Sequence, residues 1–258
     1  MISLKDKIVC ITGASSGIGA ACAVEFAKQG CALLLSARRK ERIDELARMI
    51  TTQHNVRVHT FKLDVTNKGE VEAAFASLPS GWEKIEILIN NAGLARGLAK
   101  LYEGSIQDWE EMVDTNIKGV LYVTRAIAPG MVKRNVGHII NIGSIAGHQN
   151  YPMGNVYAAT KFAVTGLSRG LKMDLLGTNV RVTSMDPGLV QTEFSQVRFR
   201  GDKERASKTY AGMTPLKPED VAEAVVFCAT RPHHVNITEV TIMATEQASV
   251  SMVHRTPA

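Results

Sequence analysis

Residues 12–19 read Thr12-Gly13-Ala14-Ser15-Ser16-Gly17-Ile18-Gly19, directly after the apolar run 7–12. The glycines are spaced G-x-x-x-G-x-G, which differs from the G-x-G-x-x-G fingerprint of many dinucleotide-binding folds. Glycine lets the backbone turn tightly and approach a pyrophosphate, and a helix that begins there directs about half a positive charge toward it. A tight strand–helix turn without a ligand would need similar glycines. The stretch predicts a strand, a phosphate-binding turn and a helix, with these contact residues: Gly13, Ser15, Gly17, Ile18 and Gly19.

Along the rest of the chain, apolar runs of strand length alternate with longer amphipathic segments. This alternation is typical of βαβ units, in which helices cover both faces of a parallel sheet. We therefore expect an α/β fold with a Rossmann-type, doubly wound parallel sheet. The expected strands are 7–12, 32–36, 56–63, 85–89, 137–142, 180–185 and 240–244, and the expected helices are 18–28, 40–52, 68–77, 106–134, 156–176 and 218–230.

The chain of 258 residues is long enough to bury a substantial core, and it shows no internal repeat or linker. We therefore expect a single domain over residues 1–258. Residues 188–215 break the alternation because they are rich in charged and polar residues, and they follow the sixth expected strand. Ligands bind beyond the carboxyl ends of parallel strands, so this insertion is expected to be a substrate lid.

Composition argues against several classes of protein. No apolar run approaches the ~18 residues that span a bilayer, and the N-terminus lacks a signal-peptide layout, which predicts a cytoplasmic protein. The four cysteines form no C-x-x-C pair and are expected to be core thiols. The net charge is +5, but only 5% of residues are aromatic and no basic tail is present, so nucleic-acid binding is not expected. The seven histidines show no metal-ligand spacing, so no metal site is expected either.

Two arginines follow the second expected strand, where many NAD-binding proteins carry an acidic residue for the ribose 2′-hydroxyl. A guanidinium group binds phosphate through charge-assisted, often bidentate hydrogen bonds. Arg38 and Arg39 therefore predict NADP(H) rather than NAD(H), although both could simply solvate a helix start. Asp64 and Val65 close the third expected strand, where the carboxylate could accept a hydrogen bond from an adenine amino group. Asn91 lies in the sequence Asn90-Asn91-Ala92-Gly93 after the fourth expected strand, where small residues would let the backbone pass close to a ribose.

Ser144, Tyr157 and Lys161 form the pattern that suggests catalysis. Positions four apart share one face of a helix, so Lys161 lies one turn from Tyr157. A free phenol loses its proton near pH ~10, and a neighbouring cation lowers that pKa. The pair could thus provide a general acid/base, with Ser144 in the same pocket. Tyr157 and Lys161 could instead be exposed residues of an amphipathic helix, and the glycine-rich turn favours the catalytic interpretation.

Taken together, these motifs resemble the classical short-chain dehydrogenase/reductase family. The resemblance covers nearly the whole chain and is carried by Gly13/Gly17/Gly19, Asn90-Asn91-Ala92-Gly93, Asn116, Ser144, Tyr157/Lys161 and Pro187-Gly188. It implies a seven-stranded sheet and, usually, a homotetramer. The family's catalytic residues match Asn116, Ser144, Tyr157 and Lys161, and its nicotinamide-side contacts match Pro187, Gly188, Val190 and Thr192.

The resemblance also implies roles for the catalytic residues. Hydride transfer makes a carbonyl oxygen negative, so a donor must face it. Tyr157 would protonate this oxygen and Ser144 would hold it. Lys161 would lower the pKa of the phenol and bind the nicotinamide ribose. Tyr157 would also contact the cofactor. Asn116 would connect Lys161 to solvent through water, or would merely kink the long helix.

Residues 192–201 and 246–249 are similar to the NADP-dependent 3-hydroxy acid dehydrogenase branch of the family, with its serine dehydrogenases, malonic semialdehyde reductases and neighbouring sulfoacetaldehyde reductases. The implied reaction interconverts a short anionic aldehyde or ketone and its alcohol. Arg96 is the first candidate for binding the substrate anion, although it could equally be an exposed arginine at a loop tip. Arg198 and Arg200 are the second candidates, and Tyr151 is a candidate pocket wall beside Ser144 and Tyr157. The alternatives are a reductase of larger apolar carbonyls, such as ketosteroids or 3-oxoacyl thioesters, and a non-catalytic NADP-binding sensor.

Overall fold

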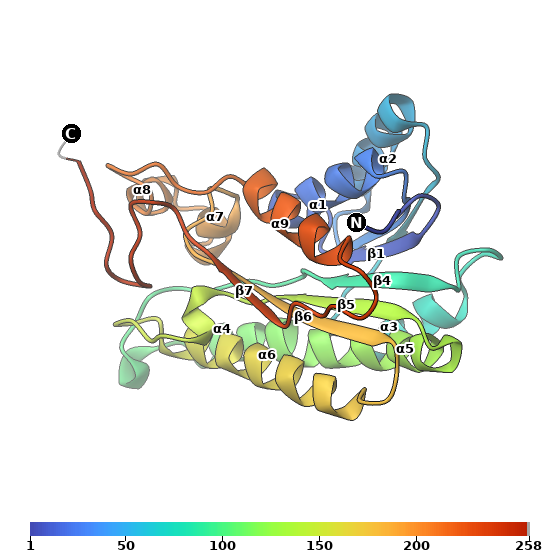
Figure 1. Ribbon diagram of the computed structural model, residues 1–258. Coiled ribbons are helices and arrows are strands. Elements are labelled where there is room, and N and C mark those ends of the chain that lie inside the picture. Colours follow the sequence, from blue (N-terminus) through green and yellow to red (C-terminus); the bar gives the residue numbers. More distant parts are fainter. Residues whose placement is uncertain (257–258) are drawn as a thin grey trace.

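Seven parallel strands form the centre of the protein in a computed structural model that describes residues 1–256 (Figure 1). The strand order is β3-β2-β1-β4-β5-β6-β7, so the chain reverses direction across the sheet between β1 and β4. This order confirms the predicted doubly wound sheet. The strands are β1 (Ile8–Thr12), β2 (Ala32–Ala37), β3 (Val58–Lys62), β4 (Ile85–Asn90), β5 (Gly137–Ile142), β6 (Val180–Pro187) and β7 (Glu239–Ile242).

Helices cover both faces of the sheet, as Figure 1 shows. One layer contains α1 (Gly17–Lys28), α2 (Lys40–His54) and α9 (Pro218–Ala229). The opposite layer contains α3 (Lys68–Ala76), α4 (Ile106–Val113), α5 (Gly119–Arg134) and α6 (Asn155–Asp174). Within residues 1–256, no helix is both long and apolar enough to cross a membrane.

The two faces of the sheet carry separate apolar clusters because alternate strand residues point to opposite sides. Val9, Ile11 and Leu33 belong to the cluster with α1 and α9, whereas Cys10 and Leu34 belong to the other cluster. β1, β2 and β5 are buried along their whole length, which explains their near-continuous apolar sequences. All four cysteines are buried free thiols, which confirms the expected core role.

The expected helix 106–134 is wrong in one respect, because it is interrupted. Residues Asp114–Lys118 form a π-helical turn between α4 and α5, and buried Asn116 lies within it. Such turns are inserted at a cost in hydrogen-bond geometry and occur frequently at functional sites. β7 also differs from its expected range: it begins one residue earlier and ends at Ile242 rather than at 244.

The 188–215 segment follows β6 and contains two short helices, α7 (Phe194–Arg198) and α8 (Lys203–Lys208). In Figure 1 both lie beyond one end of the sheet, close to the C-terminal segment. Backbone hydrogen bonds connect Gln191 to Leu216 and Leu216 to Leu189, so the two ends of the segment are fixed beside each other. The segment therefore projects as a loop over the carboxyl ends of the strands.

Candidate active site

A cavity of about 430 Å³ lies at the carboxyl ends of the strands, under the 188–215 segment. Most of the site residues expected from the sequence line it, although they come from every part of the chain between β1 and the residues after β6. Those residues are Gly13, Ser15, Ile18, Arg38, Arg39, Asp64, Val65, Asn91, Ser144, Tyr151, Tyr157, Lys161, Pro187, Gly188, Val190 and Thr192. Arg198 also lines it, whereas five expected residues do not: Gly17, Gly19, Arg96, Asn116 and Arg200.

The glycine-rich turn packs directly on the loop after β4. Gly13 has φ +66°, and a β-carbon there would lie 2.8 Å from the Cα of Ala92. The Asn91 amide donates hydrogen bonds to the carbonyl oxygens of Thr12 (2.9 Å) and Gly13 (3.1 Å). A β-carbon on Gly19 would also collide with this amide. Gly13 and Gly19 are thus needed for close packing, and Asn91 braces the turn in addition to lining the cavity.

The guanidinium group of Arg39 is fixed against this turn. Its Nε and Nη2 atoms donate to the hydroxyl of Ser15 (3.2 and 3.0 Å), and Nη2 also donates to Ser16 (2.9 Å). Its Nη1 atom donates to Glu193 of the 188–215 segment (2.9 Å). Arg38 is exposed and lines the same cavity. Two guanidinium groups and two hydroxyls around one end of a cavity are a donor set that suits a phosphate.

Tyr157, Lys161 and Ser144 come together at the other end of the cavity. Tyr157 and Lys161 lie one turn apart on α6, and the Lys161 Nζ atom is 5.9 Å from the centre of the Tyr157 ring. The same Nζ atom donates a hydrogen bond to the Ile142 carbonyl at the end of β5 (2.8 Å). The buried hydroxyl of Ser144 accepts a hydrogen bond from the backbone N–H of Ala146 (3.1 Å). Strand β5 and helix α6 therefore present one phenol, one amine and one hydroxyl to the same space.

The electrostatics of Tyr157 differ from the sequence-based expectation. Burial raises the pKa of the phenol, and this effect outweighs the lowering by the Arg198 charge and by a hydrogen bond with Ser144. The cation that lowers this pKa here is Arg198, and the lowering expected from Lys161 stays a prediction. Burial also lowers the pKa of Lys161, to about 8, although the nearby Asp186 carboxylate opposes this shift.

Asn116 lies behind the cavity, in the π-helical turn. Its Nδ2 atom donates to the Leu94 carbonyl (2.8 Å) and to the Thr160 hydroxyl (3.0 Å), and its Oδ1 atom accepts from the Leu94 N–H (2.9 Å). Thr160 directly precedes Lys161 on α6. Asn116 therefore joins the loop after β4 to the helix that carries Tyr157 and Lys161.

The three candidate arginines for an anionic substrate occupy different environments. Arg96 points away from the large cavity, because its Nε atom pairs with Glu111 (2.5 Å) and its Nη1 atom donates to the Val197 carbonyl (2.5 Å). Arg200 is exposed and pairs with Asp108 and Glu111. Arg198 lines the cavity, so it is the arginine that the fold brings to the phenol.

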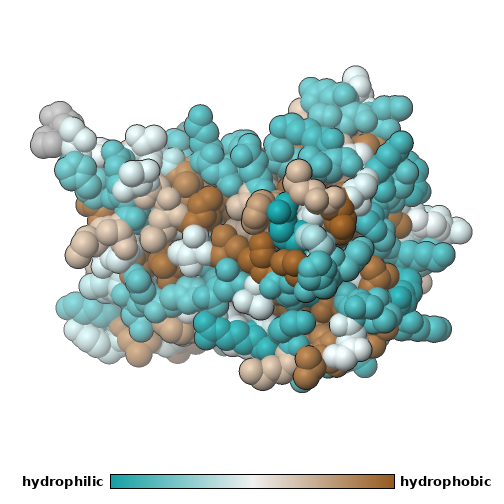
Figure 2. Space-filling view, viewed as in Figure 1, coloured by the Kyte–Doolittle hydropathy of each residue, from teal (hydrophilic) through white to brown (hydrophobic). Residues whose placement is uncertain are grey.

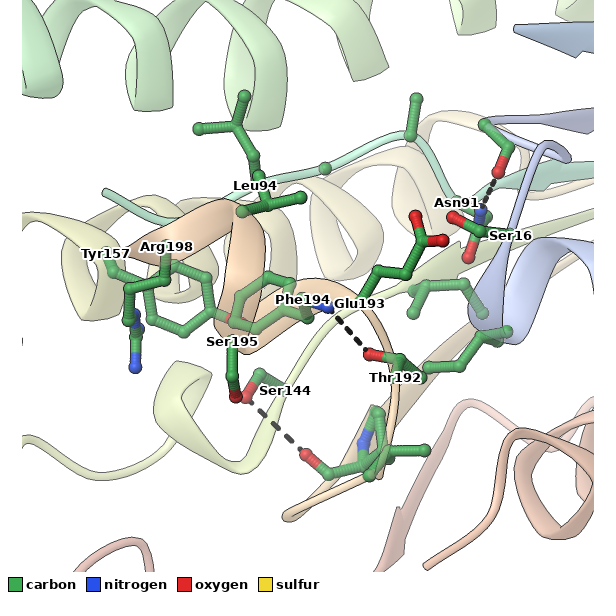
Figure 3. Close-up of a pocket in the computed structure, with 18 of the residues that line it drawn as sticks. Ser16, Asn91, Leu94, Ser144, Tyr157, Thr192, Glu193, Phe194, Ser195 and Arg198 are labelled. Carbon is green, nitrogen blue, oxygen red and sulfur yellow. Dashed lines mark hydrogen bonds between the residues drawn. The ribbon is translucent and has the colours of Figure 1, made fainter. Parts of the chain in front are cut away.

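Arg198 lies against Tyr157, as Figure 3 shows. Its Cζ atom is 4.9 Å from the centre of the Tyr157 ring and 5.4 Å from that of Phe194. Its Nη2 atom donates to the Tyr151 hydroxyl (2.8 Å), whereas its Nε atom is buried without a hydrogen-bond partner among the described residues. Sequence reasoning had ranked Arg198 behind Arg96. It had missed Phe194, which lies one helical turn from Arg198, and Glu193.

Within residues 1–256, one group of three side chains brings metal-binding atoms together: His148, Asp186 and Glu239. The His148 Nε2 atom lies 3.0 Å from Asp186, and its Nδ1 atom lies 3.7 Å from Glu239. Arg169 also pairs with Glu239 (2.9 Å). Both ring nitrogens of His148 face carboxylates, and the Arg169 guanidinium group also binds Glu239, so the three side chains already have partners within the protein.

Comparisons with known proteins agree with this geometry. The chain is 50% identical over 250 residues to the NADP-dependent 3-hydroxy acid dehydrogenase of Salmonella typhi, covering 96% of this chain and 99% of that protein. It is 43% identical over 244 residues to sulfoacetaldehyde reductase 2 of Chromohalobacter salexigens, covering 94% and 96% of the two chains. A solved structure described as the closed form of serine dehydrogenase complexed with NADP⁺ has a TM-score of 0.90 and 48% identity. It covers 96% of this chain, and this chain covers 100% of it.

The model of the family described as short chain dehydrogenase matches residues 7–203, which include the glycine-rich turn, the loop after β4 and the whole of α6. The sheet order and the full-length relatives lead to the same assignment. This chain therefore belongs to the short-chain dehydrogenase family.

Proposed function

We propose that this protein is an NADP(H)-dependent oxidoreductase that interconverts a short anionic aldehyde or ketone and its alcohol. The observation that carries the proposal is the position of Arg198, a cation that lines the cavity and contacts the Tyr157 ring. The names of the full-length relatives support this substrate class, since they specify 3-hydroxy acids and sulfoacetaldehyde.

The cavity fits a phosphorylated dinucleotide. Close packing of Gly13 on Ala92 leaves backbone, rather than side chains, at the turn, and α1 begins at Gly17 without a side-chain cap from Ser16. The free N–H groups of that helix suit a pyrophosphate, and Arg38, Arg39 and Ser15 suit a 2′-phosphate. When bound, the nicotinamide supplies or accepts a hydride.

Tyr157 would act as the general acid in the reductive direction. Burial raises its pKa, so its hydroxyl keeps a proton throughout the neutral range and can donate it to the substrate oxygen. The adjacent Arg198 charge and the Ser144 hydroxyl stabilise the phenolate that remains. Lys161, with a pKa of about 8, is mostly protonated near neutral pH and adds a second positive charge at this end of the cavity.

Arg198 would bind the substrate anion beside the proton donor. A carboxylate or sulfonate needs a cation at the cavity wall, and the guanidinium group of Arg198 belongs to a residue that lines the cavity. Tyr151 fixes the other edge of the guanidinium group through its hydroxyl. A substrate anchored there would have to be short, because the reacting oxygen must reach Tyr157, which Arg198 contacts.

Loss of NADPH absorbance with a panel of aldehydes tests this function. The panel contains malonic semialdehyde, sulfoacetaldehyde, an uncharged aldehyde of the same length and a larger apolar ketone. We expect turnover with at least one anionic aldehyde and a much lower kcat/KM for the uncharged one. Equal kcat/KM for charged and uncharged aldehydes would contradict the proposed anion site. Turnover of the larger apolar ketone alone would favour the alternative function, a reductase of larger apolar carbonyls.

We further propose assembly into a homotetramer in the cytoplasm. Large apolar side chains are exposed on α5, α6 and α9, among them Leu121 (43%), Phe162 (41%) and Phe227 (53%). Figure 2 also shows hydrophobic residues gathered where α9 lies next to the exposed edge of the sheet. Apolar faces of this kind suit contacts between identical subunits. The four buried free thiols are consistent with a reducing compartment.

A further inference from the structure

Glu193 links the 188–215 segment to the arginines that follow β2. Its carboxylate accepts hydrogen bonds from the Nη1 atom of Arg39 (2.9 Å) and from the Nη1 atom of Arg42 (2.7 and 3.0 Å). The partners are more than 150 residues apart in the sequence, and Figure 3 shows Glu193 directed toward Ser16 of the glycine-rich turn. One carboxylate therefore joins the two sides of the cavity at its phosphate-binding end.

This contact uses the group that a 2′-phosphate would need. The Arg39 guanidinium is bound to Ser15 and Ser16 on one edge and to Glu193 at the Nη1 atom. Both Arg39 and Glu193 line the cavity. The two arginines hold the pKa of the Glu193 carboxyl below its usual value, so this side chain is an anion at neutral pH.

We propose that Glu193 is an internal competitor of the cofactor 2′-phosphate, occupying Arg39 and Arg42 until a 2′-phosphorylated dinucleotide displaces it. This inference rests on the proposed NADP function. A phosphate monoester carries close to two negative charges at neutral pH, so it binds the same guanidinium groups more strongly than a single carboxylate does. Displacement would release one connection between the 188–215 segment and α2 only when the 2′-phosphate is present.

The expected magnitude is moderate because the ion pairs are partly exposed. The side chains of Arg39, Arg42 and Glu193 are 37–45% exposed, and such pairs contribute little individually. Removing the competing charge should therefore tighten binding of a 2′-phosphorylated dinucleotide by about two- to tenfold at low salt. Binding of NAD⁺ should not improve, because it carries no 2′-phosphate for these arginines.

The test is calorimetric titration of Glu193→Gln with NADP⁺ and with NAD⁺, beside the wild type. The matched control is Glu204→Gln, which removes the charge of an exposed glutamate on α8 in the same segment, where Glu204 pairs with Lys208. We expect the Kd for NADP⁺ to fall in Glu193→Gln and to stay unchanged in Glu204→Gln. In an Arg39→Ala background, most of the gain from Glu193→Gln should disappear, since the competition acts through that guanidinium.

Failure of this inference is distinguishable from failure of the proposed function. If the wild type binds NADP⁺ but Glu193→Gln leaves the Kd unchanged or raises it, Glu193 is not a competitor. Weaker binding of both cofactors in Glu193→Gln would identify the carboxylate as a simple clasp on the segment, which overturns the proposal as well. A wild type that binds no NADP⁺ would instead contradict the cofactor assignment itself.

Discussion

At the scale of single residues, a substitution of Arg198 distinguishes the proposed anion-binding site from a carbonyl pocket that does not select for charge. Arg198→Ala should raise KM for an anionic aldehyde by about ten- to a hundredfold, because a charge-assisted hydrogen bond in a buried site is lost. The KM for an uncharged aldehyde should change little. Arg200→Ala is the matched control, since Arg200 lies on the same segment but pairs outside the cavity. An equal rise in KM for charged and uncharged aldehydes would contradict the anion-binding role.

Lys161 predicts the pH dependence of the reductive reaction. Its pKa is lowered to about 8, so its positive charge is fully present well below pH 8 and is lost as the pH rises through that value. The kcat for reduction should therefore be level near neutral pH and fall above about pH 8, a limb that a pH–rate profile measures. Asp186 raises the pKa of Lys161, so Asp186→Asn should move the falling limb to lower pH. A limb that stays in place or moves to higher pH would rule out this assignment.

The sequence identified the residues whose spacing is local, but it could not place those whose positions depend on contacts between distant segments. Tyr157 and Lys161 share one turn of a helix, so their proximity follows from periodicity alone. The direction of Arg96 depends on Glu111, which lies on another element, and no local pattern reveals that pairing. The direction of the Tyr157 pKa shift could not be predicted from local sequence either, because it depends on burial and on Arg198, which belongs to the distant 188–215 segment.

At the scale of elements, the glycine-rich turn depends on close backbone contact. Gly13→Ala should lower the free energy of unfolding by about 1–3 kcal/mol, because the residue has φ +66° and its β-carbon would press on the Ala92 backbone. Dinucleotide affinity should fall with it. The control is Gly69→Ala in α3, where a β-carbon would meet only Asn67 at 3.6 Å, and this variant should be neutral or slightly more stable. Thermal or denaturant unfolding compares the two variants, and equal stability would show that the turn tolerates a side chain.

The element boundaries show where sequence patterns stop being informative. The apolar period of residues 106–134 continues through the break between α4 and α5, so the pattern predicts one helix. The π-helical turn at Asp114–Lys118 contains Asn116, whose side chain bonds to Leu94 in the loop after β4 and to Thr160 on α6. The local sign of this break in the sequence is Asn116 itself, a polar amide where the helical pattern predicts an apolar residue.

At the scale of the whole molecule, the sheet order was predictable because alternating strands and helices allow few topologies. The faces proposed to bind a second copy were not predictable, since that proposal rests on exposed apolar side chains from α5, α6 and α9 rather than on a motif. We expect light scattering after size-exclusion chromatography to give about four times the 28.0 kDa mass of one chain. Phe162→Glu on α6 should reduce that mass, and a monomeric wild type would contradict the assembly.

Stopped-flow single-turnover measurement of Tyr157→Phe tests proton donation by the Tyr157 hydroxyl most directly. The substitution removes only the hydroxyl, so the NADPH affinity, measured separately by titration, should be essentially unchanged. The rate of NADPH oxidation with a short anionic aldehyde should fall by about 10²–10⁴-fold, the range that general acid catalysis contributes. A variant that binds NADPH and oxidises it at the wild-type rate would show that Tyr157 is not the proton donor.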